Sequence, residues 1–452
     1  MEKDRTVARR DMTTGDITKT MLIFAVPMIL GNLLQQCYNI ADTLIVGRFL
    51  GSGALAAVGS AYTLMVFLTS ILLGLSMGSG AVFSIRFGEK NPDRLRNSIF
   101  VSFVLISMVT ILLTVISIFC IDGILRLLRV PAEIYPLMRG YVRIIFFGIV
   151  FTFLFNYFAC LLRAVGDSVS PLVFLAISTI INIVLDIVLI VVYPLGVEGA
   201  AIATVIAQAI AGVGITVYTL VRYRELRVGK KDMRFSRETL RDIGQSSSLT
   251  CIQQSVMNFG ILMVQGLVNS FGTVVMAAFA AAVKIDSFAY MPVQDLGNAF
   301  STFVAQNHGA GQSARIRAGI RKITVTTIIF CLSIGALVSV FAKPLTLIFI
   351  DAGEVEIVAI SVQYLRTVAP FYFGIGILFL LYGFYRALLR PGMSLVLTII
   401  SLGTRVLLAY LLAAIPAIGV AGIWWAIPIG WILADATGVV YYLRNRKLLL
   451  PN

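Results

Sequence analysis

The chain is poor in charge and in the side chains on which most catalytic and metal sites depend. Only 13% of its 452 residues are charged, against roughly 25% in an ordinary soluble domain. It has a single histidine, His308, which excludes any mechanism that needs two imidazoles. The sequence contains no His-Glu-x-x-His motif and no Gly-x-Ser-x-Gly with the flanks of a nucleophile elbow. We therefore expect that the protein is not an enzyme.

Cysteine is also scarce, and no cysteine stands at a metal-binding or redox spacing. The five cysteines lie within apolar runs, and no two of them form a Cys-x-x-Cys pair. We expect buried free thiols at all five positions, which are Cys37, Cys120, Cys160, Cys251 and Cys331.

Hydrophobic residues are abundant and make up 59% of the chain. Apolar runs of about 20 residues recur from Thr20 to Leu443, each long enough to cross a hydrocarbon core of roughly 30 Å. Continuous runs favour helices over the short alternating segments of a β-barrel. The first run is too long for a signal peptide and lacks a small-residue cleavage site, so we interpret it as a retained span. The sequence predicts an all-α polytopic membrane protein with twelve transmembrane helices, near residues 20–44, 54–83, 98–120, 141–162, 172–192, 198–220, 244–268, 275–304, 322–342, 362–385, 393–414 and 421–443.

The net charge of +14 indicates membrane topology rather than a nucleic-acid surface. Basic residues gather in alternate loops, including the N-terminus and the stretch RYRELRVGKKDMRFSRETLRD. Loops on the other side, such as YPLGVEGA and IPAIGVAG, carry almost none, although LLRVPAEIYPLMRGYVR is an exception. The positive-inside rule predicts cytoplasmic N- and C-termini in a cell (inner) membrane. We expect no nucleic-acid partner, since no basic, aromatic-interleaved soluble domain is present.

The two halves of the chain resemble each other. Shifts of 221 and 223 residues superpose glycine, arginine and tyrosine positions of the two halves, among them Gly88 with Gly309, Arg94 with Arg315, Tyr141 with Tyr364 and Arg163 with Arg386. Two six-span lobes follow, an N-lobe at 1–232 and a C-lobe at 233–452. An even number of spans gives both lobes the same orientation, so their pseudo-twofold axis should run along the membrane normal. This arrangement favours alternating access over a channel, for which no filter motif is visible.

Two acids inside apolar runs of the N-lobe are the strongest functional signal, because an ionised carboxylate in a membrane is costly without a role or a partner. Asp42 lies in the first run, and polar residues seven, four and three positions earlier share its helical face. In the fifth run, Asn182 and Asp186 share a face. No lysine or arginine lies within the first, fifth or sixth run to pair with these acids.

We therefore predict a coupling-cation site for a proton or Na⁺, with Na⁺ held at Asp42, Asp186 and Asn182. The predicted site comprises Asp42, Asp186, Asn182, Gln35, Asn156 and Thr204. The alternative for each of these polar residues is an interhelical hydrogen bond without a transport role, and for Asn156 and Thr204 both explanations stay open. We expect no other cofactor.

The C-lobe does not repeat this pattern. The positions aligned with Asp42, Asn182 and Asp186 are Leu262 or Met263, Arg405 and Ala409. Lys284 and Asp295 instead lie eleven residues apart, about three turns, on one helical face. Lys284 and Arg405 could satisfy Asp295, Asp286 or Asp435, or could contact substrate. The candidate substrate-cavity residues are Tyr38, Asn39, Asn258, Lys284, Met291, Asp295 and Arg405.

Four stretches together resemble one transporter family. They are PMILG from Pro27 with QxxYNIADT, GxxALAAVG from Gly51, RAxGDS with the following Pro171, and GVxGAAxAT from Gly196. Over nearly its whole length the chain resembles the MATE (multidrug and toxic compound extrusion) family. Asp42 together with Asn182-x-x-x-Asp186 is similar to the DinF-like prokaryotic branch, whose cation site lies in the N-lobe. The branch that uses acids in spans seven and ten is not matched.

The resemblance implies a V-shaped, two-lobed antiporter that exports amphipathic, often cationic, small molecules in exchange for H⁺ or Na⁺. We expect its partners to be the lipid bilayer and these substrates, and we expect a monomer. The alternative is a flippase for lipid-linked saccharides with a related two-lobe fold. Such a flippase should line its cavity with Arg and Lys to bind pyrophosphate, whereas the N-lobe offers acids.

Overall fold

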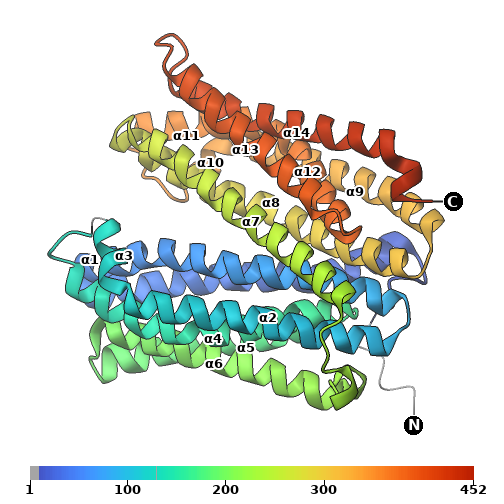
Figure 1. Cartoon of the computed structure of the whole chain (residues 1–452). Helices are drawn as coiled ribbons and strands as arrows, with labels where there is room; N and C mark the ends of the chain where they lie inside the picture. The colour runs from blue at the N-terminus through green and yellow to red at the C-terminus, as the bar shows by residue number, and fades with distance from the viewer. Residues whose placement is uncertain (1–9, 129, 452) are drawn as a thin grey trace. The chain divides into compact units, whose positions relative to one another are not determined.

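The computed structural model describes residues 10–128 and 130–451, and these form helices joined by turns and loops (Figure 1). No strand occurs in these two stretches. The helices of the first half are α1 (Ile17–Gly88), α2 (Pro92–Phe119), α3 (Ile121–Leu127), α4 (Tyr135–Ala164), α5 (Val169–Ile187, extended by a π-helical turn at Val188–Val192) and α6 (Gly196–Arg222). Those of the second half are α7 (Arg237–Asn269), α8 (Thr273–Gly309), α9 (Ser313–Val340), α10 (Ala342–Thr346), α11 (Val355–Val368), α12 (Tyr372–Ala387), α13 (Pro391–Ala413) and α14 (Val420–Leu449).

Twelve helices in the described part of the chain are long and apolar enough to cross a membrane, which confirms the predicted fold class. Helix α1 supplies the first two of these spans, divided at Gly51, and α11 with α12 supplies the tenth, Val355–Ala387. The division at Gly51 has a backbone cause. Its φ of 83° lies in the left-handed region, which only glycine adopts without steric cost.

The turn before α5 is fixed by the aspartate and glycine of the RAVGDS stretch. Asp167 Oδ1 accepts hydrogen bonds from the backbone N–H groups of Val169 (3.1 Å) and Ser170 (2.9 Å), which α5 leaves without helical partners. Gly166 has a φ of 94°, and a Cβ there would lie 2.0 Å from the carbonyl oxygen of Arg10. The backbone of Arg10 donates to the Gly166 carbonyl at 2.9 Å, so no larger residue fits at this turn.

The chain forms two compact units. Unit 1 comprises Val26–Cys251 together with the N-terminal residues up to Asp11, and unit 2 comprises Met12–Ala25 and Ile252–Asn452. Two helices are therefore shared, since the first turns of α1 belong to unit 2 and the first half of α7 belongs to unit 1. The division into lobes at residues 232 and 233 stays a prediction, and these packing units differ from it at those two helices.

Local contacts explain why the segment Met12–Ala25 belongs to unit 2 and the first half of α7 belongs to unit 1. In unit 2, the Met12 N–H donates to Gln306 Oε1 at 3.1 Å, and Asn307 Nδ2 donates to the Met12 carbonyl at 3.0 Å. In unit 1, the start of α7 packs closely on α1, where Ser79 and Ser247 hydroxyls are 2.8 Å apart. A Cβ at Gly78 would lie 2.5 Å from the backbone of Ser247, so the missing side chain permits this approach.

Candidate functional site

The two predicted acids of unit 1 meet. Asp42 on α1 and Asp186 on α5 lie within hydrogen-bonding reach of each other through their carboxyl groups. Asp186 is fully buried. The Oδ1 atoms of both residues are shielded from water and have no hydrogen-bond partner in the described chain. No lysine or arginine is among the groups that act on either carboxyl group.

An amide and a hydroxyl complete the surroundings of this acid pair. Asn182 precedes Asp186 by one helical turn and is 1% exposed. With its amide oriented so that both atoms have partners, Asn182 donates to Asp186 Oδ2 at 2.9 Å and accepts from the Thr204 N–H at 3.2 Å. The Thr204 hydroxyl also lies 3.5 Å from the Tyr38 hydroxyl. Helices α1, α4, α5 and α6 each contribute to one polar cluster, which we call the acid pair cluster: Asp42, Asp186, Asn182, Thr204, Tyr38 and Tyr141.

Tyr141 is the member of this cluster that the sequence argument missed as a site residue. It lies on α4, is 7% exposed, and its hydroxyl interacts with that of Thr204. Asp42 and Asp186 both lie near enough to act on it electrostatically. The signal that could have identified it was its match to Tyr364 in the internal repeat, since both tyrosines turn out to face a buried acid.

The structure does not bring two of the predicted site residues into this hydrogen-bonded set. Gln35 is exposed on α1, although it lies two turns from Asp42 on the same helix. Asn156 donates to the Thr152 carbonyl at 2.8 Å, one turn earlier in α4. Asn39 accepts from the Thr43 hydroxyl at 2.7 Å through its backbone carbonyl. A role for Gln35, Asn156 and Asn39 in ion or substrate binding stays a prediction.

The acid pair cluster offers the chemistry of a hard cation or a proton. Carboxylate, amide and hydroxyl oxygens are the donors that such cations prefer. Two carboxylates that are close together and removed from water repel each other when both are charged, and a bound cation or proton removes that repulsion. Among the residues that the structure describes, no three His, Cys, Asp or Glu side chains gather as a metal site.

Unit 2 contains a buried acid with different partners. Asp286 on α8 is 4% exposed and accepts two phenolic hydrogen bonds, from Tyr364 to Oδ2 at 2.6 Å and from Tyr372 to Oδ1. Arg405 on α13 and Tyr290, one turn along α8, are its electrostatic neighbours. We call these five residues the Asp286 cluster. It unites α8, α11, α12 and α13 of unit 2.

Lys284 and Asp295, which the sequence places on one face of α8, differ in burial, and a role for either in satisfying another charge or in contacting substrate stays a prediction. Lys284 is exposed, and its ammonium group lies 5.9 Å from the centroid of the Phe349 ring, whereas Asp295 is 2% exposed. Their spacing aligns them along the helix, but three turns and Pro292 separate them, and α8 is far more buried at Asp295. Asn258 donates to the Gln254 carbonyl at 3.2 Å within α7. Met291, one helical turn before Asp295 on α8, is partly exposed.

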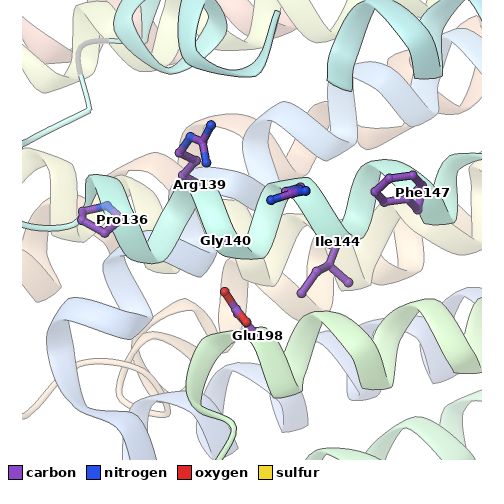
Figure 2. A pocket seen from close by; sticks show the side chains of 7 residues that line it. Pro136, Arg139, Gly140, Ile144, Phe147 and Glu198 are labelled. Carbon is purple, nitrogen blue, oxygen red and sulfur yellow. The ribbon is translucent and has the colours of Figure 1, made fainter. Parts of the chain in front are cut away.

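A separate pocket of about 390 Å³ lies in unit 1 where α4 begins (Figure 2). Figure 2 shows Arg139 directed away from α6, while Glu198 of α6 lies beside Gly140. Arg139 Nε donates to Asp122 Oδ1 at 2.7 Å, which holds the pKa of Asp122 at about 2 with help from Tyr135. Asp122, which lies in α3 just before the basic loop that departed from the charge pattern, therefore offsets one arginine of that loop. The pocket is lined by Pro136, Arg139, Gly140, Arg143, Ile144, Phe147 and Glu198, none of which belongs to the acid pair cluster.

Comparisons with known proteins agree with the fold and the repeat. The chain is 31% identical over 440 residues to the probable multidrug resistance protein YpnP of Bacillus subtilis, covering 96% of this chain and 97% of that protein. It is 33% identical over 316 residues to the probable multidrug resistance protein YoeA of the same organism, covering 68% and 67%. A solved transporter of the MOP superfamily from Pyrococcus furiosus superposes with a TM-score of 0.90 at 23% identity, covering 98% of both chains.

The MatE family model matches two stretches, residues 27–188 and 249–411, and the second begins 222 residues after the first. This offset agrees with the shifts of 221 and 223 residues that superpose the two halves of the sequence. The two matches together cover well over half of the chain, and each contains one of the buried acid clusters or most of it. The chain belongs to the MatE family.

Proposed function

We propose that this MatE family protein is a secondary active multidrug efflux transporter that exports amphipathic, often cationic, small molecules in antiport with H⁺ or Na⁺. Its family and its twelve spans make it a multi-pass membrane transporter and not an enzyme. The names of its relatives support efflux of drugs. The observation that carries the coupling proposal is the pair of buried carboxyl groups of Asp42 and Asp186 with no basic partner.

The acid pair would couple ion entry to export because its charge depends on whether an ion is bound. With a proton or Na⁺ present, the repulsion between Asp42 and Asp186 is relieved, and the helices that hold them can pack closely. Without the ion, the pair favours an arrangement in which water or a cationic substrate compensates the charge. Export follows if the two arrangements open to opposite sides of the membrane.

Asn182 and Thr204 would position the pair for this exchange. Asn182 donates to Asp186 Oδ2 and leaves Oδ1 free for the ion. The hydroxyl oxygens of Thr204 and Tyr38 lie 3.5 Å apart in the same cluster, so neutral oxygen donors are available near Asp186 as well. The distribution of basic loops supports cytoplasmic termini in the cell (inner) membrane, and we expect a monomer.

A flippase for lipid-linked saccharides is not favoured. Pyrophosphate requires cationic partners, and the charges at the buried site of unit 1 are both negative. The acid pair attracts cations and repels phosphate, so a phosphate-bearing substrate would need a site elsewhere.

The test is transport by the purified full chain in proteoliposomes, with pH and Na⁺ gradients imposed separately and ethidium as the substrate. We expect one of the two gradients to drive ethidium accumulation and the other to have little effect. Accumulation that is independent of both gradients would contradict the proposal. Binding of the coupling ion by Asp186→Asn, measured by calorimetry across pH and Na⁺ concentration, should be weakened or lost, and unchanged binding would count against the two-acid site.

A further inference from the structure

Arg405 is a cation in the middle of an apolar span of unit 2, and it has no bonded partner. It lies on α13, within the span Pro391–Ala413. No hydrogen bond or ion pair joins its guanidinium group to another described residue, and its Nε is shielded from water and unbonded. The residue as a whole is partly exposed, so the far end of the guanidinium group reaches accessible space. Such a group is costly in a membrane unless something binds it.

Asp286 balances the charge of Arg405 without using its donors. Both carboxylate oxygens of Asp286 already accept phenolic hydrogen bonds, from Tyr364 and Tyr372. Asp286 and Arg405 interact electrostatically, yet they form no ion pair. The guanidinium group therefore keeps its planar fork of N–H donors, whose geometry matches a carboxylate or a phosphate.

The surroundings of Arg405 are aromatic. Tyr290 is partly exposed and lies near enough to Arg405 to interact with it electrostatically, and its ring centroid lies 6.4 Å from that of Phe379. Tyr364, a second electrostatic neighbour of Arg405, packs edge-on against Trp424 with ring centroids 4.9 Å apart. Trp424 is fully buried, so this packing fixes Tyr364 and, through it, Asp286. A ligand at Arg405 would bind a guanidinium group that has the aromatic side chain of Tyr290 in its surroundings.

We propose that Arg405, with Tyr290 beside it, forms a subsite for the carboxylate or phosphate group of an amphipathic, aromatic substrate. The inference rests on the proposed function only in treating the ligand as a transported substrate. It extends the substrate class from amphipathic cations to molecules that also carry an anionic group. Asp286, Tyr364 and Tyr372 act as positioning residues, because they hold charge near Arg405 without occupying its donors.

The test compares an anionic and a cationic probe on the purified full chain in an uncharged detergent. Fluorescence anisotropy gives the Kd of 6-carboxyfluorescein and of ethidium. Hydrogen bonds to charged groups are strong enough that Arg405→Gln should weaken carboxyfluorescein binding about tenfold to hundredfold. Ethidium binding should change less than about twofold. Arg405→Lys keeps the charge but loses the fork, so its effect should be intermediate.

The matched control is Arg366→Gln, which removes an exposed arginine of the same unit and should leave both affinities unchanged. A purely structural role of Arg405 would be to balance Asp286. The double variant Asp286→Asn/Arg405→Gln separates the two roles, since it removes both charges together. We expect it to recover thermal stability relative to Arg405→Gln but not carboxyfluorescein affinity.

Three results would overturn the subsite. They are an unchanged carboxyfluorescein Kd in folded Arg405→Gln, an equal loss in Arg366→Gln, and full recovery of affinity in the double variant. Displacement of the dye by added phosphatidylglycerol at equimolar concentration would assign Arg405 to a lipid headgroup instead of a transported solute. These binding outcomes do not depend on gradient-driven transport, so failure of the ion-coupling proposal would be seen separately, in proteoliposomes.

Discussion

Matching tyrosines lie near buried acids in each unit, but the charged neighbours of these acids differ. In unit 1, Tyr141 lies beside a pair of carboxyl groups with no basic partner. In unit 2, Tyr364 donates to the single carboxylate of Asp286, which has an arginine nearby. The repeat thus preserves a tyrosine at one position while the charges around it differ in sign and number.

This difference identifies residues that give the two repeated halves buried clusters of different charge. The alignment places Arg405 of unit 2 where unit 1 has Asn182. In unit 1 that position hydrogen-bonds an acid, and in unit 2 it supplies a cation with no bonded partner. This position is therefore one of three at which the halves differ in polar character, since Asp42 and Asp186 are also replaced by apolar residues in the second half.

The largest expected effect is on transport, when a carboxylate is removed from one cluster and, for comparison, from the other. Asp42→Asn should abolish gradient-driven ethidium transport, because an amide cannot release and take up a proton or balance Na⁺. Asp286→Asn should retain the dependence on the gradient, because the acid pair is intact. Both variants are measured in the proteoliposome assay, with insertion and thermal stability checked on the same preparations.

The comparison fails if Asp42→Asn keeps full ion-driven transport, or if Asp286→Asn loses it while remaining folded. The first result would remove the coupling role from unit 1. The second would place a coupling acid in unit 2 and make the two clusters functionally alike.

The matching tyrosines give the next largest effect, this time on stability. Tyr364→Phe removes a donor from a buried carboxylate, and a hydrogen bond to a charged group contributes about 1.5–3 kcal/mol to the free energy of unfolding. Tyr141→Phe removes a contact with the neutral Thr204 hydroxyl, for which about 0.5–1.5 kcal/mol is expected. Thermal denaturation in detergent should rank Tyr364→Phe as the less stable variant. The reverse ranking would show that the acid pair depends on Tyr141 more than Asp286 depends on Tyr364.

The sequence alone predicts one of these clusters better than the other. Twelve spans follow from run length, and the residues around Asp186 follow from helical spacing, since Asn182 lies one turn away. The acid pair is predictable because both acids stand in predicted apolar runs, 20–44 and 172–192, that contain no lysine or arginine. The Asp286 cluster is not, because no local spacing relates Tyr364 or Tyr372 to Asp286.

Lys284 shows the limit of spacing arguments in the same unit. Residues eleven apart share a face of a helix, but that rule does not state how deep each residue lies. The exchange of helix ends between the two units is similarly invisible, since the contacts of Met12 with Gln306 and Asn307 join residues nearly 300 positions apart.

A smaller effect is expected at Asn182, one of the positions at which the clusters differ. Asn182→Ala removes the donor to Asp186 Oδ2 and should weaken coupling-ion binding by about tenfold, since one hydrogen bond to a charged group is lost. Calorimetry on the purified protein measures the change. Ser394→Ala, which removes a buried hydroxyl bonded to the Tyr382 carbonyl in unit 2, is the control and should leave ion binding unchanged. An unaltered ion Kd in Asn182→Ala would show that this position does not set the cation chemistry of unit 1.

The smallest effect concerns an acid outside the spans that does have a basic partner. Arg139, with Tyr135, holds the pKa of Asp122 at about 2, below its ordinary value of 3.8. A lowered folded-state pKa stabilises the fold above the unfolded-state pKa, and this contribution is lost as the pH falls from about 4 to about 2. Arg139→Gln should therefore lower the Tm slightly at pH 7, and the difference from the unsubstituted chain should shrink at pH 3. The effect is small because both side chains are nearly half exposed, where water screens the pair. A Tm difference that grows on acidification would contradict the pairing of Arg139 with Asp122. A Tm difference that shrinks would show that this acid, unlike Asp42, has a basic partner that stabilises its charged form.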